Sequence, residues 1–183
     1  MRHIVGYVIV AADGMIADAK GVMPESIRNP ADQAFFQDGL DRVAAIVHGR
    51  HSYEGGPRAA RRKRLVVTRQ VAATAPDPDY PNALLWNPTG ITLEAAVEQL
   101  GAADGDIAII GGPEVFSIFL PRYHTFYLSR AAHATIPGGR PVFNEVGPTA
   151  TPEDVLTRHG LKPGPRRDLD AAAGVSMVEW TRG

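Results

Sequence analysis

The sequence predicts an α/β fold: a three-layer α/β/α sandwich around a central, mostly parallel sheet of about eight strands, with an antiparallel hairpin at its C-terminal end. Two observations predict it. Strand-like apolar runs alternate with segments in which apolar residues recur at helical spacing. The first run, residues 4–11, is apolar almost throughout, which is typical of a parallel strand buried on both faces. At 183 residues, we expect a single domain, residues 1–183.

Composition and charge exclude several classes of protein. Hydrophobic residues make up 44% of the chain and charged residues 21%, as in ordinary globular proteins. The formal net charge of -1 provides no broad basic field, so we expect a small-molecule partner and no nucleic acid. The absence of cysteine excludes disulfides and thiolate chemistry. The first apolar run is too short to span a membrane and lacks a cleavage pattern, so we expect a cytoplasmic protein without membrane contact.

The first third of the chain predicts a strand, a loop and a helix. Gly14 follows the first strand, and the polar stretch 18–29 has no sustained period, so it predicts a loop over a site. Pro30 suits the first turn of a helix and Asn29 suits its N-cap. We therefore expect a helix over 30–40.

The middle of the chain predicts three more strands. Residues 43–47 form an apolar run that ends at a glycine, and the polar stretch 50–54 is expected to open a short helix. The runs 64–68 and 83–86 are strand-like, and a proline-rich connection separates them.

The last part of the chain continues the alternation. Residues 91–100 predict a helix with Thr92 as N-cap and Gly101 beyond its end. A strand at 106–110, a helix from 113 to about 120 and a strand at 125–129 follow. Two further strands are expected near the C-terminus, at 156–159 and 175–180.

Two glycine turns could hold phosphates. Residues 49–52 and 111–114 each follow a predicted strand and precede a predicted helix, where unpaired backbone amides attract anions. Arg50 in the first turn and Arg69, next to Thr68 at the end of another strand, favour the 2′-phosphate of NADP. Neither GxGxxG nor the P-loop pattern occurs, which disfavours a Rossmann dehydrogenase or an NTPase.

One buried acid together with a hydride donor is sufficient to reduce an imine, because the nitrogen needs only a proton and a well-placed donor. Asp32 is the candidate acid, at the start of the predicted helix over 30–40. Burial would raise its pKa, whereas the helix N-terminus would lower it.

Four blocks of sequence combine these features in one order: NPADQAFF at 29–36, GRHSYE at 49–54, RKRLVVTR at 62–69 and IIGGPEVF at 109–116. With this order and spacing, the chain resembles the dihydrofolate reductase family. The resemblance implies that family's fold and the NADPH-dependent reduction of 7,8-dihydrofolate to tetrahydrofolate, a step of one-carbon metabolism.

The resemblance also implies roles for individual residues. Asp32 would be the catalytic carboxylate that supports protonation of the substrate. The residues implied to bind NADPH are Ile16, Gly49, Arg50, His51, Ser52, Thr68, Arg69, Gly111, Gly112, Pro113, Glu114 and Val115. Those implied to bind substrate are Phe36, Arg62, Ile110 and Ser129, with Arg62 meeting a substrate carboxylate.

The sequence departs from the family pattern at several positions. Glu25 stands where a tryptophan is common, and Phe116 stands where a tyrosine is frequent. Arg140 lies in a stretch that replaces an acidic-threonine pair, and Gln33 puts an amide beside the candidate carboxylate.

Alternative functions remain open from sequence. The chain could reduce a different pterin or the ribosylamino-pyrimidine of riboflavin synthesis, or it could be a noncatalytic nucleotide-binding homologue. Its six histidines show no metal-ligand spacing, so we expect no metal. We expect a monomer or a homodimer.

Overall fold

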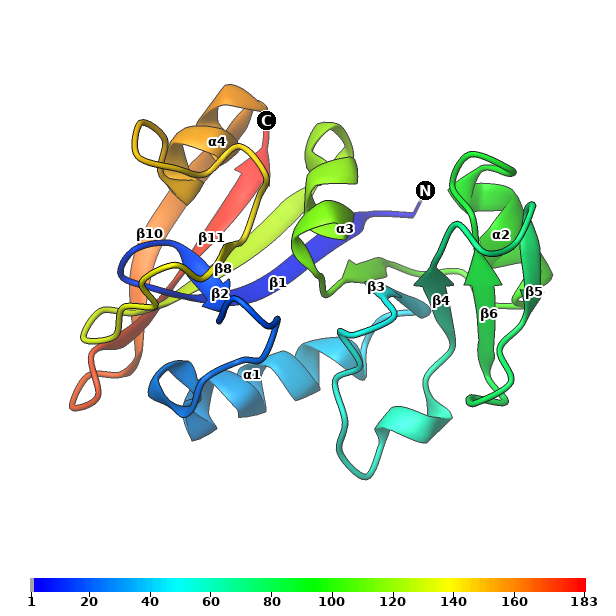
Figure 1. Cartoon of the computed structure of the whole chain (residues 1–183), viewed down its shortest axis with the longest axis horizontal. Coiled ribbons are helices and arrows are strands. Elements are labelled where there is room, and N and C mark those ends of the chain that lie inside the picture. The colour runs from blue at the N-terminus through cyan, green and yellow to red at the C-terminus, as the bar shows by residue number, and fades with distance from the viewer. Residues whose placement is uncertain (1) are drawn as a thin grey trace.

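The computed structural model describes residues 2–183 and is organised around one nine-stranded sheet, whose strands lie in the order β10-β11-β8-β1-β7-β3-β4-β6-β5 (Figure 1). The six inner strands, from β8 to β6, pair in parallel, and the three outer ones pair antiparallel. The strands are β1 (Ile4–Ala11), β3 (Ala45–Gly49), β4 (Arg64–Val67), β5 (Thr74–Pro76), β6 (Ala83–Trp86), β7 (Ile107–Ile109), β8 (Thr125–Ala131), β10 (Leu161–Asp170) and β11 (Val175–Arg182).

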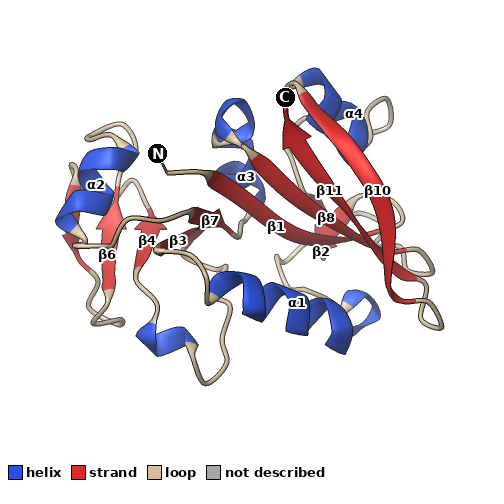
Figure 2. Cartoon of the chain, turned by 180° about the vertical axis from the view of Figure 1, so that it is seen from behind, coloured by secondary structure: helices blue, strands red, loops and turns tan. Residues whose placement is uncertain are grey.

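Helices cover both faces of this sheet, which confirms the predicted three-layer α/β sandwich. α1 lies on one side, and α3 and α4 lie on the other, in the view of Figure 1 and in the view from behind in Figure 2. The helices are α1 (Pro30–Leu40), α2 (Leu93–Gln99), α3 (Pro113–Ile118) and α4 (Pro152–Arg158), with single 3₁₀ turns η1 (Glu25–Ile27), η2 (Ala59–Arg61) and η3 (Leu120–Arg122).

Side-chain alternation along β1 produces the two helical layers. Val5 and Tyr7 pack with Leu40 of α1, whereas Ile4 and Val10 pack in the larger core against α2, α3 and α4. Successive strand residues point to opposite faces, so a strand buried on both faces must be apolar throughout. The continuous apolar run at 4–11 therefore indicates its position inside the sheet.

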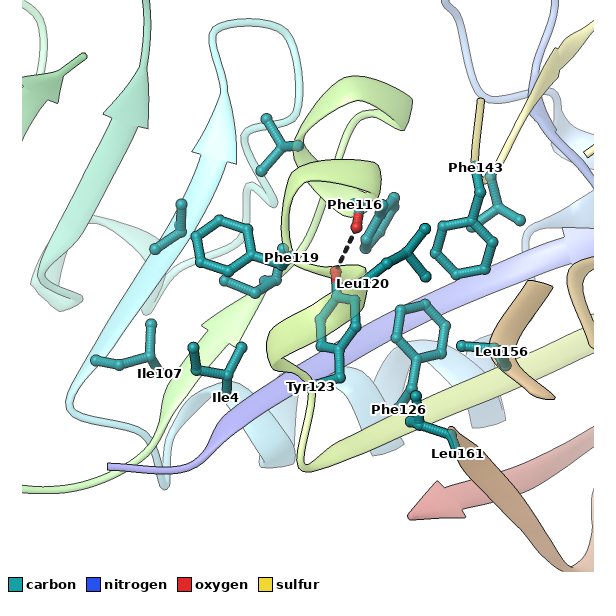
Figure 3. Packing of buried hydrophobic residues seen from close by; sticks show 14 of the residues in the cluster. Ile4, Ile107, Phe116, Phe119, Leu120, Tyr123, Phe126, Phe143, Leu156 and Leu161 are labelled. Carbon is teal, nitrogen blue, oxygen red and sulfur yellow. Dashed lines mark hydrogen bonds between the residues drawn. The ribbon is translucent and has the colours of Figure 1, made fainter. Parts of the chain in front are cut away.

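The larger core is built on aromatic rings (Figure 3). Phe126 of β8 packs edge-on against Phe116 and Tyr123, with ring centroids 5.9 and 4.9 Å apart. The Tyr123 hydroxyl donates a hydrogen bond of 3.1 Å to the carbonyl of Phe116, which satisfies this fully buried polar group. The contact ties the last turn of α3 to the chain that enters β8.

The N-terminus of α1 is capped as the sequence predicts. The Asn29 side chain accepts hydrogen bonds from the amides of Ala31 and Asp32, at 2.9 and 3.2 Å, and Pro30 occupies the first helical turn. The Asn29 amide group also donates to Asp170 of β10 at 2.9 Å. This end of the helix is therefore anchored to both the local chain and the sheet.

The predicted helix after β3 is absent. Residues 50–54 form a turn and an irregular segment, and no helix occurs before the 3₁₀ turn η2. Gly55 and Gly56 both have positive φ, at 64° and 89°, and Pro57 follows, so the chain cannot continue in a right-handed helix there.

The C-terminal region also differs from the prediction. The strand expected at 156–159 is the end of α4, whose Thr151 and Asp154 form a reciprocal capping box. The first strand of the antiparallel hairpin is β10 instead, a mostly exposed, charged edge strand that pairs with β11. Prolines and charges are common on edge strands because they oppose pairing with other chains.

Three short strands were not predicted. β5 adds an antiparallel edge beside β6, and β2 (Met15–Ala17) pairs with β9 (Arg140–Pro141) in a separate two-stranded sheet. None of the helices within residues 2–183 is both long and apolar enough to cross a membrane.

Gly6 in β1 provides a test of this packing. A Cβ atom there would lie 2.2 Å from the Phe126 ring, so Gly6→Ala must displace a packed aromatic. We expect Gly6→Ala to lower the free energy of unfolding by about 1–3 kcal/mol, measured by urea denaturation. Gly147→Ala, where a Cβ meets nothing within 4 Å, is the control and should stay within about 0.5 kcal/mol of wild type. Equal stability of the two variants would contradict the packing argument.

Candidate functional site

A large cavity lies between α1, the sheet and the turns that follow β3 and β7. Its volume is about 1360 Å³, and its lining comes from β1, α1, β8, the first turn of α3 and the ends of β3 and β4. Pockets for one small ligand usually measure roughly 300–1,000 Å³. This cavity therefore has room for a substrate and a cofactor side by side.

Asp32 lines the cavity from the first turn of α1 and is only 9% exposed. Burial raises the pKa of this carboxyl above its ordinary value, because the charged form is poorly solvated, and a hydrogen bond with the Ser129 side chain partly opposes the shift. Ser129 comes from β8, so two elements far apart in sequence meet here. A buried carboxyl in a cavity that stays protonated to higher pH than usual is suited to handling a proton.

Aromatic side chains form the wall beside this carboxyl. Tyr7 and Tyr127 are paired across β1 and β8 and stack with ring centroids 5.0 Å apart. Phe35 meets Tyr127 edge-on at 5.2 Å, and Phe36 lies 6.2 Å from Tyr7. All four rings line the cavity. They offer a flat, apolar surface against which a planar heterocycle can pack.

The Tyr7 ring extends beneath α1. A Cβ atom at Gly39 would lie 2.7 Å from the Tyr7 hydroxyl oxygen, so only glycine leaves room for the ring at this point of the helix. Burial raises the pKa of Tyr7 to about 12, so its hydroxyl stays neutral at physiological pH.

The two glycine turns meet at the other part of the cavity. The amide of Gly49, at the end of β3, donates a 2.7 Å hydrogen bond to the carbonyl of Gly111, which follows β7. Gly111 has φ of 112°, and a Cβ there would lie 2.8 Å from the Phe116 ring, so a glycine is required. The Gly111–Gly112 peptide is cis. The two glycine turns thus lie side by side, although only the second leads into a helix.

A buried charged cluster supports the first turn. Arg64 of β4 is 1% exposed and donates to both carboxylate oxygens of Glu54, at 2.6 and 2.7 Å. Its Nη1 also lies 3.0 Å from Nε2 of His48, and an arginine can only donate, so Nε2 must be the unprotonated ring nitrogen. Nδ1 then carries the proton and donates to the Gly49 carbonyl at 2.6 Å.

The pKa values of His48 and Glu54 are both shifted in the direction that these hydrogen bonds require. Burial lowers the pKa of His48, which keeps its ring neutral. Burial raises the pKa of Glu54, but the hydrogen bonds from Arg64 and from the backbone, together with the positive charge of Arg64, outweigh burial. The net pKa is therefore below the ordinary value, and Glu54 is ionised. The cluster replaces the missing helix as the support of residues 50–54.

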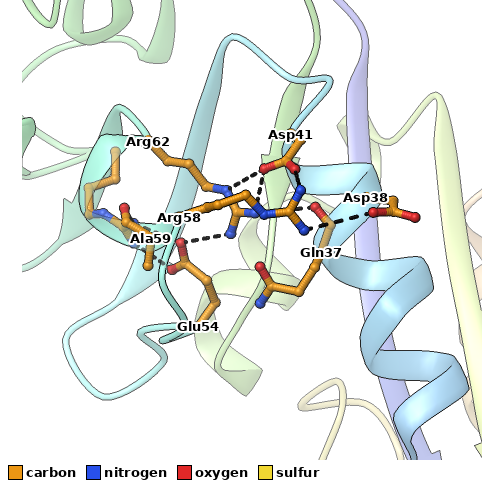
Figure 4. A network of polar contacts seen from close by, with 8 residues as sticks. Gln37, Asp38, Asp41, Glu54, Arg58, Ala59 and Arg62 are labelled. Carbon is orange, nitrogen blue, oxygen red and sulfur yellow. Dashed lines mark hydrogen bonds and ion pairs between the residues drawn. The ribbon is translucent and has the colours of Figure 1, made fainter.

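Arg62 is not where the resemblance implies. Its side chain is 7% exposed and does not line the cavity; its guanidinium donates to Asp41 at 2.6 Å, Glu54 at 3.4 Å and the Gln37 carbonyl at 3.2 Å (Figure 4). The predicted contact of Arg62 with a substrate carboxylate therefore has no place in this structure. The reason is the pair of carboxylates, which come from the end of α1 and from the segment after β3.

The cavity brings together almost all the other predicted site residues. Gly111 does not line the cavity, although its neighbours Ile110 and Gly112 do. The residues that do line the cavity are Ile16, Asp32, Phe36, Gly49, Arg50, His51, Ser52, Thr68, Arg69, Ile110, Gly112, Pro113, Glu114, Val115 and Ser129.

Several lining residues were not predicted. Tyr7 and Tyr127 carry no motif of their own, and only an aromatic residue inside an otherwise apolar run could have indicated them. Glu54 ends the GRHSYE block, but no site role was predicted for it. Lys20 and Arg28, from the loop over 18–29, also line the cavity, which agrees with the predicted position of that loop over a site.

The departures from the family pattern also face this cavity. Glu25, Gln33, Phe116 and Arg140 all belong to its lining. The Arg140 guanidinium donates to the carbonyl of Ala19 at 3.3 and 3.4 Å and so holds the loop next to β2. Across residues 2–183, no group of three or more His, Asp or Glu side chains is placed to hold a metal ion.

A comparison with family models gives one result: the model described as dihydrofolate reductase matches residues 4–151. No curated protein sequence matches the chain.

Solved structures share the fold at low sequence identity. A structure named for riboflavin biosynthesis, from Shewanella sp. PV-4, is 18% identical with a TM-score of 0.67, covering 100% of this chain and 99% of that one. The dihydrofolate reductase of Enterococcus faecalis, complexed with NADP(H), is 17% identical with a TM-score of 0.63, covering 99% and 96%.

A third structure is longer than this chain. The diaminohydroxyphosphoribosylaminopyrimidine deaminase/5-amino-6-(5-phosphoribosylamino)uracil reductase of Thermotoga maritima is 14% identical with a TM-score of 0.67. The match covers 100% of this chain but 57% of that one. These likenesses establish a shared fold.

The raised pKa of Asp32 predicts a pH-dependent gain of stability in Asp32→Asn. The folded state binds the proton more tightly than the unfolded state, so wild-type stability falls as pH rises from the unfolded pKa through the folded one. Asp32→Asn has no carboxyl to ionise at this position and so lacks this loss. As pH rises, its free energy of unfolding should therefore increase relative to that of wild type, by about 1.4 kcal/mol for each unit of pKa shift.

Urea denaturation between pH 3 and 8 measures this effect, with Asp38→Asn, an exposed position on the same helix, as the control. A difference between Asp32→Asn and wild type that does not change with pH would contradict the raised pKa.

Proposed function

The chain belongs to the dihydrofolate reductase family, and on that premise we propose that it is an NADPH-dependent oxidoreductase that reduces the imine of a reduced pterin such as 7,8-dihydrofolate. The observation that carries the proposal is the buried Asp32 carboxyl, with its raised pKa, in a cavity that has room for two ligands. The aromatic wall of Tyr7, Phe36 and Tyr127 supports it, because a pterin is planar.

Asp32 would act on the proton side of the reaction. An imine becomes a better hydride acceptor as its nitrogen gains a proton, and a carboxyl that is protonated to higher pH than usual can sustain that proton. The Asn29 cap fixes the first turn of α1 and so the direction of the Asp32 side chain. Ser129 would orient the carboxyl through its hydrogen bond.

The residues around the glycine turns fit a doubly phosphorylated dinucleotide. Arg50, His51 and Ser52 follow β3, and Thr68 and Arg69 follow β4, so cations and hydroxyl donors line one region of the cavity. The first-turn amides of Glu114 and Val115 have no partner within α3 and add donors there. NADPH bound here would supply the hydride, and the chain would supply position, charge neutralisation and exclusion of water.

A second candidate is reduction of a phosphorylated ribosylamino-pyrimidine. Lys20 and Arg140 line the cavity beside the loop over 18–29, and neither is paired with a carboxylate among the described residues. They could meet a substrate phosphate. We place the pterin first because its reduction would use the Asp32 helix start, whereas reduction of the ribosylamino-pyrimidine would not need it.

Asp32→Asn tests the proposal. Purified protein should oxidise NADPH in the presence of 7,8-dihydrofolate, and the fall in NADPH absorbance measures the rate. In Asp32→Asn, kcat should be lower by about 100-fold or more, because the proton-handling group is gone. NADPH affinity, measured by fluorescence titration, should be unchanged. Full activity of Asp32→Asn would exclude this role, whereas activity only with the ribosylamino-pyrimidine would favour the second candidate.

Arg69→Gln tests the cofactor. If Arg69 meets the 2′-phosphate, the variant should lose about tenfold or more of its preference for NADPH over NADH, because a charge-assisted hydrogen bond is lost. Arg61→Gln, an exposed arginine outside the cavity lining, is the matched control. An unchanged ratio of the two kcat/KM values in Arg69→Gln would place the 2′-phosphate elsewhere.

A further inference from the structure

We propose that the substrate is a reduced pterin with a short, uncharged substituent, and that Asp41 and Glu54 determine this specificity by occupying Arg62. This inference rests on the proposed function above and narrows its substrate. Dihydrofolate carries a glutamate tail, whose carboxylates need cations or water wherever they bind. The argument therefore depends on what the structure offers at the corner between the end of α1 and the segment after β3.

At this corner Arg62 donates to three acceptor groups of the protein. The Nε and Nη2 of Arg62 both donate to Asp41 Oδ1, at 3.2 and 2.6 Å, and Nη2 also donates to the Gln37 carbonyl. Nη1 donates to Glu54 Oε1 at 3.4 Å. Each nitrogen of the guanidinium thus has an acceptor from the protein, and four of its five N–H groups are used. A substrate carboxylate that bound both terminal nitrogens would have to compete with Asp41 and Glu54.

Displacement is opposed by burial. The Arg62 side chain is 7% exposed, so a ligand carboxylate that reached its guanidinium would have to give up most of its own hydration. Hydrogen bonding to Arg62 lowers the pKa of Asp41, so this carboxylate is charged and competes fully for the guanidinium.

Arg62 is one of three arginines at the corner that form ion pairs. Three arginines (Arg58, Arg62, Arg64) pair with three carboxylates (Asp38, Asp41, Glu54), as Figure 4 shows for part of the set. Each of these three arginines therefore already has a carboxylate partner within the protein. Arg62 does not belong to the lining of the cavity, so an acidic tail that entered the cavity would not meet its guanidinium.

A matched pair of substrates tests the inference without any variant. 7,8-Dihydrobiopterin and 7,8-dihydrofolate share the reduced ring and differ in the tail. Wild-type protein with NADPH should show a kcat/KM for dihydrobiopterin at least about tenfold above that for dihydrofolate. A preference for dihydrofolate of similar size would overturn the inference.

Asp41→Asn tests the assigned residue. With one carboxylate neutralised, Arg62 becomes available, and the kcat/KM for dihydrofolate should rise about fivefold relative to that for dihydrobiopterin. Asp38→Asn, the exposed and more distant partner of Arg58 at 3.8 Å, is the control and should leave the ratio unchanged. An equal ratio in Asp41→Asn and wild type, with both folded by circular dichroism, would remove Asp41 from the argument.

The proposed function can fail separately. If neither pterin is turned over, equilibrium binding of both to the wild-type protein, by quenching of tryptophan fluorescence, decides the inference. Tighter binding of dihydrobiopterin would support it even without catalysis. Tighter binding of dihydrofolate, or no binding of either, would overturn it.

Discussion

The hydrogen bond between the Gly49 amide and the Gly111 carbonyl joins the ends of two neighbouring parallel strands, and the site is arranged around this junction. Parallel strands of one sheet end on the same side, so the turns that follow them must share space there. Glycine is needed because the Phe116 ring and the positive φ of Gly111 leave no room for a side chain. Residues that follow β3, β4 and β7 therefore line one cavity although they are far apart in sequence.

A second requirement is that charged groups are buried near this junction without being left unpaired. Arg64 and Glu54 neutralise one another, and the neutral His48 ring connects them to the Gly49 carbonyl. Removing one member of such a cluster leaves a buried charge, which is far more costly than removing a surface pair. The cluster thereby supports a segment that has neither helix nor strand to hold it.

Asp32 is also buried, but its surroundings differ from those of Glu54. It has no arginine partner, so its burial raises the pKa, whereas the pKa values of Glu54 and Asp41 are lowered by the arginines beside them. The same chain thus keeps one carboxyl ready to carry a proton and two others ionised. Under the proposed function, the first would serve the chemistry, and the other two would shape which substrates can approach.

Local signals in the sequence determined the elements that depend on nearby residues. Helix caps and buried strands depend on residues that are adjacent in sequence, so a short pattern is enough to predict them. Examples are the apolar run of β1, the Asn29 cap of α1 and the glycine turn before α3. The capping box of α4 is equally local: Thr151 and Asp154 start a helix that runs to Arg158, so the strand predicted at 156–159 is wrong. The residues of the four blocks likewise pointed to one cavity, which most of them line.

Only the tertiary structure decided that β10 is a strand, since its exposed, charged residues gain their order from pairing with β11. It also decided the partner of Arg62: Asp41 lies 21 positions away, and no local pattern reveals which charges folding will bring together.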